Sequence, residues 1–160
     1  MKFSQQEKEY YMQQALLEAK KAAANEDVPI GVIIVCESEI IARSFNRREL
    51  DGCATHHAEI CAIEAANEVV GNWRLLDCAL FVTIEPCVMC AGAISLARIP
   101  QVYFGATNPK FGAAGSLYQI LEDRRLNHRV IVESGILKTE CASLMQDFFQ
   151  YRRKRKKEQV

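Results

Sequence analysis

The feature that most constrains the fold is the alternation of β-rich runs with helical patterns along the 160 residues. The expected helices cover residues 5–24, 57–69, 87–97 and 116–121 and continue from about 140, and the expected strands cover residues 32–36, 40–45, 79–84, 102–105 and 130–133. Strands that alternate with helices after a hairpin predict a three-layer α/β fold. In this fold a mixed, largely parallel five-stranded sheet carries helices on both faces.

Local signals support this order of elements. Ser4 and Glu7 form an S-x-x-E capping box at the start of the first helical pattern. Residues 46–55 form a polar loop between the hairpin and the next helix. A chain of this length builds one good core, so we expect a single domain over residues 1–160, with a basic C-terminal helix or tail at about 140–160.

Two short motifs carry the chemistry. His57-Ala58-Glu59 is followed, 26 residues after Glu59, by Glu85-Pro86-Cys87-Val88-Met89-Cys90. This H-x-E and P-C-x-x-C combination is the signature of zinc deaminases. Two thiolates and an imidazole are ligands that Zn²⁺ prefers, and three protein ligands leave the fourth tetrahedral position for water. The sequence predicts one Zn²⁺ per chain, held by His57, Cys87 and Cys90, with Glu59 as the proton carrier.

The spacing of the ligands predicts that they lie at helix starts. The two cysteines are three residues apart and share one helical face, with Pro86 expected at the first helical position. His57 and Glu59 would point roughly 200° apart around a regular helix, so both can approach one ion only near a helix end. We therefore place His57 within the first turn, with Thr55 as the expected cap.

Two other interpretations of the cysteines stay open. Cys61 follows His57 by four residues and could complete a closed structural site, although that site would leave Glu59 without a role. The C-x-x-C pair could also be a redox motif, but the proline precedes the first cysteine instead of lying between the two. Seven cysteines without an export signal favour reduced thiols. Those in apolar runs, expected to be small buried side chains, are Cys36, Cys78 and Cys141, whereas Cys53 receives no assignment.

The formal net charge of zero conceals a basic tail. Residues 152–157 are six consecutive cations, without which 14 basic residues face 20 acidic ones. This asymmetry favours contact with a polyanion along one side, although many charge runs are only solvated. No apolar stretch approaches the roughly 20 residues that a membrane span needs, and the N-terminus lacks a signal-peptide region. We expect a cytoplasmic protein without a membrane partner.

Segments along nearly the whole chain resemble the bacterial tRNA-specific adenosine deaminases of the cytidine deaminase superfamily. Beyond the zinc signature they are Pro29-Ile30-Gly31, Asn46-Arg47, Phe104-Gly105-Ala106, Gly135-Ile136-Leu137, Phe148-Phe149 and residues 91–93, 112–116 and 127–130. The resemblance implies a cytidine deaminase-like fold and hydrolytic deamination of adenosine to inosine at the first (wobble) anticodon position of tRNA, by a homodimer. Glu59 would take a proton from the attacking water and later deliver protons to the ring nitrogen and the departing ammonia.

The same resemblance implies a substrate pocket. Asn46 would bind the flipped base, which would pack between Ile30 and the ring of His57. A loop-capping role for Asn46 is an alternative, because the residue directly follows an expected strand.

Contacts to the anticodon loop are implied farther along the chain. Lys110 matches a phosphate-side contact of the family. One of Phe148 and Phe149 is expected in the core, and the other, with Arg152, beside the anticodon loop. Asn108 stands where the family often has an acidic residue, and an amide accepts from a ribose 2′-hydroxyl less strongly than a carboxylate. The strictness for RNA over DNA therefore stays open.

Two other functions are compatible with the motifs. A deaminase of free bases or nucleotides, of the guanine or cytosine type, would share the zinc chemistry but give the basic C-terminal helix no role. A non-catalytic, zinc-stabilised RNA-binding module would leave Glu59 replaceable without loss.

Overall fold

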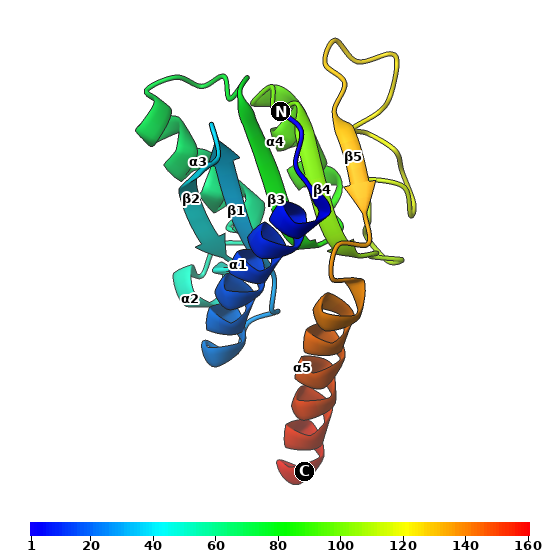
Figure 1. Ribbon diagram of the computed structural model, residues 1–160. Coiled ribbons are helices and arrows are strands. Elements are labelled where there is room, and N and C mark those ends of the chain that lie inside the picture. The colour runs from blue at the N-terminus through cyan, green and yellow to red at the C-terminus, as the bar shows by residue number, and fades with distance from the viewer.

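The computed structural model describes residues 1–160 and contains one five-stranded sheet in the order β2-β1-β3-β4-β5 (Figure 1). The strands are β1 (Gly31–Cys36), β2 (Glu39–Phe45), β3 (Cys78–Ile84), β4 (Gln101–Ala106) and β5 (Ile131–Ser134). β1 pairs antiparallel with β2 and with β3, whereas the β3–β4 and β4–β5 pairs are parallel. The predicted mixed, five-stranded sheet is confirmed. It is not largely parallel, because β1 of the N-terminal hairpin runs against both of its neighbours.

The helices are α1 (Gln5–Ala24), α2 (Arg48–Asp51), α3 (Ala58–Val70), α4 (Val88–Leu96) and α5 (Lys138–Glu158). α1 and the beginning of α5 cover one face of the sheet, and α3 and α4 cover the other, as Figure 1 shows. The three-layer arrangement is therefore confirmed. The C-terminal half of α5 projects beyond the sheet, from the same end of the molecule as α2. None of the helices combines the length and the apolar character that crossing a membrane requires.

Alternate residues of the central strands enter two separate apolar clusters. Along β1, Val32 and Ile34 pack with α3 and α4, whereas Ile33 and Val35 pack with α1. This period of two, with both faces buried, explains why the strand sequences are uninterrupted apolar runs.

The start of the chain is fixed by capping and by close packing. The Ser4 hydroxyl accepts from the Glu7 backbone N–H at 3.1 Å, and the Ser4 N–H donates to the Glu7 carboxylate at 2.7 Å, which confirms the predicted capping box. Gly31 lies directly beneath α1, where a Cβ atom would overlap the Ala15 carbonyl oxygen. This contact brings the C-terminal end of α1 to the edge of the sheet where the functional residues gather.

Two elements differ from the sequence prediction. The polar loop after β2 contains the short helix α2, which the sequence did not indicate. The predicted helix over residues 116–121 is wrong, because this segment folds back on itself through an isolated bridge between Ala114 and Gln119. Gly115 adopts a φ of 133°, which lies outside helical geometry.

Candidate active site and metal centre

Three ligand side chains converge at the end of β3. His57 is the N-cap residue of α3, Cys87 is the N-cap residue of α4, and Cys90 lies in the first turn of α4. The Nδ1 atom of His57 lies 3.6 Å from each of the two cysteine Sγ atoms. The three ligand atoms all lie within 4.8 Å of one another.

These separations fit a zinc ion. Bonds of about 2.3 Å to sulfur and about 2.0 Å to nitrogen at tetrahedral angles separate the two ligand atoms by roughly 3.5 Å. Both sulfurs lie at the N-terminus of α4, where the helix dipole favours negative charge. The donor set and its geometry therefore suit Zn²⁺.

Glu59 gives a second, independent observation. It occupies the first turn of α3 and is 3% exposed, and its Oε2 is the one buried side-chain polar atom of the chain without a hydrogen-bond partner. Buried polar atoms are nearly always paired, so an unpaired oxygen beside three metal-type ligands fits a site that takes a bound group. Burial raises the pKa of the Glu59 carboxyl to about 7.

The ionisation of the three ligands is interdependent. Hydrogen bonding from the Cys90 thiol, with a further contribution from His57, lowers the pKa of Cys87 to about 4. The neighbouring Cys87 sulfur and burial together raise the pKa of Cys90. The Cys87 sulfur also raises the pKa of His57. One thiolate therefore forms readily, and a cation at this position would favour the second.

The sequence prediction placed the starts of α3 and α4 one residue too early. His57 does not lie within the first turn of α3 but precedes it as an extended N-cap residue, with φ −68° and ψ 153°. Thr55 is not the cap; its carbonyl oxygen accepts from the His57 N–H at 2.8 Å. Pro86 likewise precedes the N-cap residue of α4 instead of occupying its first turn. Because His57 lies outside the helix, helical spacing does not prevent it and Glu59 from facing one site.

The other cysteines lie apart from this cluster. Cys61 belongs to no group of metal-type ligands, and burial raises its pKa although the Ser44 side chain lies beside it. The closed four-ligand site therefore receives no support from the structure. Cys78 and Cys141 are buried in the core as expected, and Cys36 is half-buried.

Replacing Cys61 with alanine is expected to leave metal occupancy unchanged, because the side chain does not reach the three ligands. Metal analysis of purified Cys61→Ala beside Cys90→Ala measures this, with loss of the metal expected only in Cys90→Ala. Loss of the metal from Cys61→Ala would instead establish a four-ligand structural site.

A buried carboxylate next to the ligands, Glu85, organises the loop that follows β4. It accepts from the backbone N–H groups of Asn108, Ala114 and Ser116 at 3.0–3.1 Å and from the Ser116 hydroxyl. Burial would raise the pKa of Glu85, but these hydrogen bonds lower it overall. Gly112 packs so closely that a Cβ atom would overlap the carboxylate. The sequence did not reveal this role, which depends on backbone donors more than 20 residues away.

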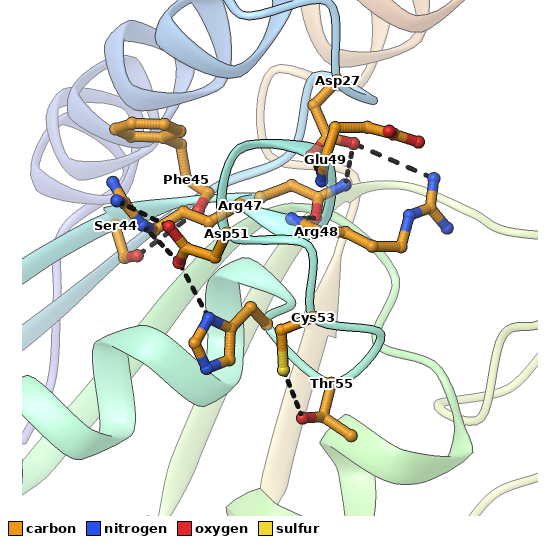
Figure 2. A network of polar contacts seen from close by, with 11 residues as sticks. Asp27, Ser44, Phe45, Arg47, Arg48, Glu49, Asp51, Cys53 and Thr55 are labelled. Atoms are coloured by element: carbon orange, nitrogen blue, oxygen red, sulfur yellow. Dashed lines mark hydrogen bonds and ion pairs between the residues drawn. The ribbon is translucent and has the colours of Figure 1, made fainter.

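Asn46 directly follows β2 and binds Asp27 and Arg48, two members of the polar network that Figure 2 labels. It is 4% exposed, its Nδ2 donates to Asp27 at 3.2 Å and to the Val28 carbonyl at 3.3 Å, and its Oδ1 accepts from the Arg48 N–H at 3.3 Å. The loop-capping role is thus observed, and base binding stays a prediction. Ile30 is half-buried and accepts from the Asn46 N–H at 3.0 Å, so these two residues do lie together.

The residues expected to face RNA line two hollows on α5. Phe148 is buried at 7% exposure, whereas Phe149 is 37% exposed, so one phenylalanine belongs to the core as predicted. Lys110 and Phe149 line a groove of about 340 Å³ that Arg153 also borders. Arg152 lies over the Phe148 ring at 5.4 Å and borders a separate hollow of about 320 Å³ toward the end of α1.

Comparison with known proteins agrees with the site. The family profile of MafB19-like deaminases matches residues 6–153. A tRNA-specific adenosine deaminase of Streptococcus pyogenes (serotype M18) is 59% identical over 157 residues, which cover 98% of this chain and 99% of that protein. The tRNA-specific adenosine deaminase of Bacillus subtilis is 46% identical over 149 residues, covering 93% of this chain and 92% of the relative.

A solved structure from studies of A-to-I editing by tRNA:A34 deaminases is similar in both fold and sequence. It superimposes with a TM-score of 0.81 at 42% identity, covering 84% of this chain and 98% of that one. The sheet, the His-Cys-Cys cluster and the buried carboxylate define an enzyme of the deaminase class with a cytidine deaminase-like fold. Within that class, the chain belongs to the MafB19-like deaminases, in the family of the bacterial tRNA-specific adenosine deaminases.

Proposed function

We propose that this enzyme catalyses the hydrolytic deamination of adenosine to inosine at the wobble position of tRNA. The observation that carries this proposal is the buried Glu59 carboxylate, with one unpaired oxygen, beside His57, Cys87 and Cys90. The names of relatives that match over nearly the whole chain support adenosine in tRNA as the substrate. In the net reaction, water replaces the 6-amino group of adenine, and ammonia leaves.

Zn²⁺ is the proposed cofactor, one per chain, with Nδ1 of His57 and the sulfurs of Cys87 and Cys90 as its ligands. When bound, it would supply Lewis-acid activation of a water molecule. The protein's contribution is to hold the two sulfurs at a helix N-terminus and the imidazole in its extended N-cap position.

Glu59 is the proposed general base and then the general acid. Its carboxylate accepts a proton from the attacking water and delivers protons to the ring nitrogen and to the departing amine. Its fixed place in the first turn of α3 directs it to the three ligands, and its burial keeps bulk water from competing for the proton.

Substrate contacts, assembly and location complete the proposal. Asn46 and Ile30 would contact the base, and Lys110, Phe149 and Arg152 would contact the anticodon loop around α5, with Phe148 supporting Arg152 from the core. The enzyme would act as a homodimer in the cytoplasm, where tRNA is available. Exposed apolar side chains at both ends of α4, Val88 and Leu96, offer surface for such a dimer.

Incubating the purified enzyme with total tRNA and sequencing for inosine tests the function. We expect inosine at the wobble position of one or more tRNAs, and no deamination of free adenosine, guanine or cytosine. Deamination of a free base or nucleoside, without inosine in tRNA, would replace this proposal with the free-base alternative.

A further inference from the structure

We infer that Asp27 is a positioning residue for deamination, whose buried carboxylate fixes the Asn46 amide and the two loops that form the substrate pocket. This inference deepens the proposed function and rests on it. Asp27 lies outside the cluster of metal-type ligands and just beyond the end of α1.

The carboxylate of Asp27 is fully buried at 0% exposure and faces only donors. Its Oδ1 accepts from the Val28 N–H at 2.8 Å and from Asn46 Nδ2 at 3.2 Å, and its Oδ2 accepts from the Glu49 N–H at 2.8 Å. The Arg48 guanidinium lies 3.8 Å from Oδ1. Figure 2 shows Asp27 facing Arg48 and Glu49 across this network.

These contacts determine the orientation of Asn46. The Nδ2 group donates to Asp27 and to the Val28 carbonyl, and Oδ1 accepts from the Arg48 N–H. A flipped amide would place its oxygen against the carboxylate and its hydrogens against an N–H, so only one orientation satisfies every group. Asp27 therefore determines which atoms of Asn46 any substrate would meet.

The same carboxylate joins two segments that are distant in the sequence. It binds Val28, which precedes Ile30, and Glu49 at the start of α2. The Asn46 N–H donates to the Ile30 carbonyl at 3.0 Å, which closes the contact between the two loops. The Asp27 side chain thus holds Asn46 and the segment that contains Ile30, the two residues with proposed base contacts, in a fixed position relative to each other.

A separate set of contacts holds the segment that leads from Asn46 to the metal ligand His57. The Arg47 N–H donates to the His56 carbonyl at 3.0 Å, and the Arg47 guanidinium binds Asp51 at 2.9 and 3.0 Å (Figure 2). His56 Nδ1 lies 2.8 Å from the same Asp51 carboxylate. Because these contacts do not involve Asp27, its loss should disturb the substrate pocket and leave the metal centre in place.

A general stabilising role explains the carboxylate less well. Burying a charged group is costly, and exchanging a whole buried ion pair for well-packed apolar residues is often neutral for stability, so a buried charge is weak evidence for a purely stabilising role. The Asp27 carboxylate accepts from all three of its hydrogen-bond donors at once, whereas an amide of the same size would direct its own hydrogens at one or more of them. An aspartate at position 27 is thus needed to orient the Asn46 amide more than to fill space in the core.

The test is a double-mutant cycle between Asp27 and Asn46 on a tRNA that the wild-type enzyme deaminates. Asp27→Asn and Asp27→Ala are each made alone and combined with Asn46→Ala, and kcat, KM, metal content and the unfolding midpoint are measured. Asp27→Asn is expected to lower kcat/KM by about 10- to 100-fold, as misplaced contacting groups typically do, with unchanged metal content. In the Asn46→Ala background the same change should cost about twofold or less, because the two residues act as one unit.

Glu18→Gln is the matched control, since Glu18 is another buried carboxylate of the α1 region, at 3% exposure, whose ionic partner is Lys21. Its kcat/KM should stay within about twofold of wild type, because its carboxylate binds Lys21 on its own helix and not the groups that Asp27 holds. Asp27→Asn keeps the test decisive if Asp27→Ala fails to fold.

Three results would overturn the inference: unchanged kcat/KM in Asp27→Asn, an equal loss in both backgrounds, or a loss explained by missing metal. Wild-type enzyme that forms no inosine in any tRNA would overturn the proposed function and this inference together. An active wild type with a fully active Asp27→Asn variant overturns the inference alone.

Discussion

Replacing Glu59 with glutamine is expected to reduce inosine formation by about 10²–10⁴-fold or more, because a positioned acid–base group is lost and it serves in several proton transfers. Glutamine matches the size of glutamate but cannot accept and release the proton. Glu59 is not among the three ligands, so the variant should bind the metal as wild type does. tRNA binding should also persist, since the proposed RNA contacts lie on other residues.

Single-turnover inosine formation, metal analysis and tRNA binding on the same preparations measure these expectations. Glu64→Gln is the matched control, because Glu64 lies on the same helix but is exposed, and its activity should equal that of wild type. Activity of Glu59→Gln within a few-fold of wild type would contradict the mechanism and favour a non-catalytic, zinc-stabilised module. Loss of metal from the variant would show that Glu59 supports the metal centre instead.

The sequence predicted the strands closely because both faces of the sheet are buried. Each predicted strand lies within two residues of the observed bounds, since apolar runs such as residues 78–84 are buried along their whole length. The pattern could not give the direction in which neighbours run, because parallel and antiparallel buried strands have the same composition. The share of parallel pairs was therefore overestimated.

The motifs predicted which residue types would meet, and the structure does bring His57, Cys87 and Cys90 together. The supporting residues escaped prediction because most of their partners are backbone N–H groups, which every residue except proline carries. Asp27 and Glu85 read as ordinary acidic residues, one near a helix end and the other inside a motif. Only the fold shows that each one gathers donors from segments more than 18 residues away.

The helix predicted at residues 116–121 is absent for the same reason, because distant hydrogen-bond partners decide the local structure. The Ser116 N–H and hydroxyl both bind Glu85, and the Leu117 N–H donates to the Gly112 carbonyl, so a compact loop replaces the first helical turn. Local spacing favours a helix there, but the distant carboxylate provides better partners for the same groups. The loop thereby carries Lys110 to the groove beside Phe149.

Deleting residues 152–160 is expected to weaken tRNA binding by about 10- to 10³-fold at low ionic strength, because several phosphate contacts and their released counterions would be lost. These residues form the last two turns of α5 and carry six exposed cations. Arg155 pairs with Glu26, just beyond the end of α1, so the basic end of the helix is held against the body at this point.

The salt dependence of binding separates phosphate contacts from a general loss of fold. Each contact removed should lower the slope of log K against log salt by about 0.7–0.9, so the truncated enzyme should give a visibly flatter plot. Replacing Lys20 with glutamine is the control, because it removes an exposed cation from α1 and should leave the slope unchanged. Preference for adenosine should persist in the truncated enzyme, since the Asn46 pocket is intact and base contacts, not phosphate contacts, specify the base.

If affinity and slope both equal those of wild type, the tail is only a solvated extension. The RNA-facing surface would then have to lie around Lys110 and the Arg47-Arg48 pair.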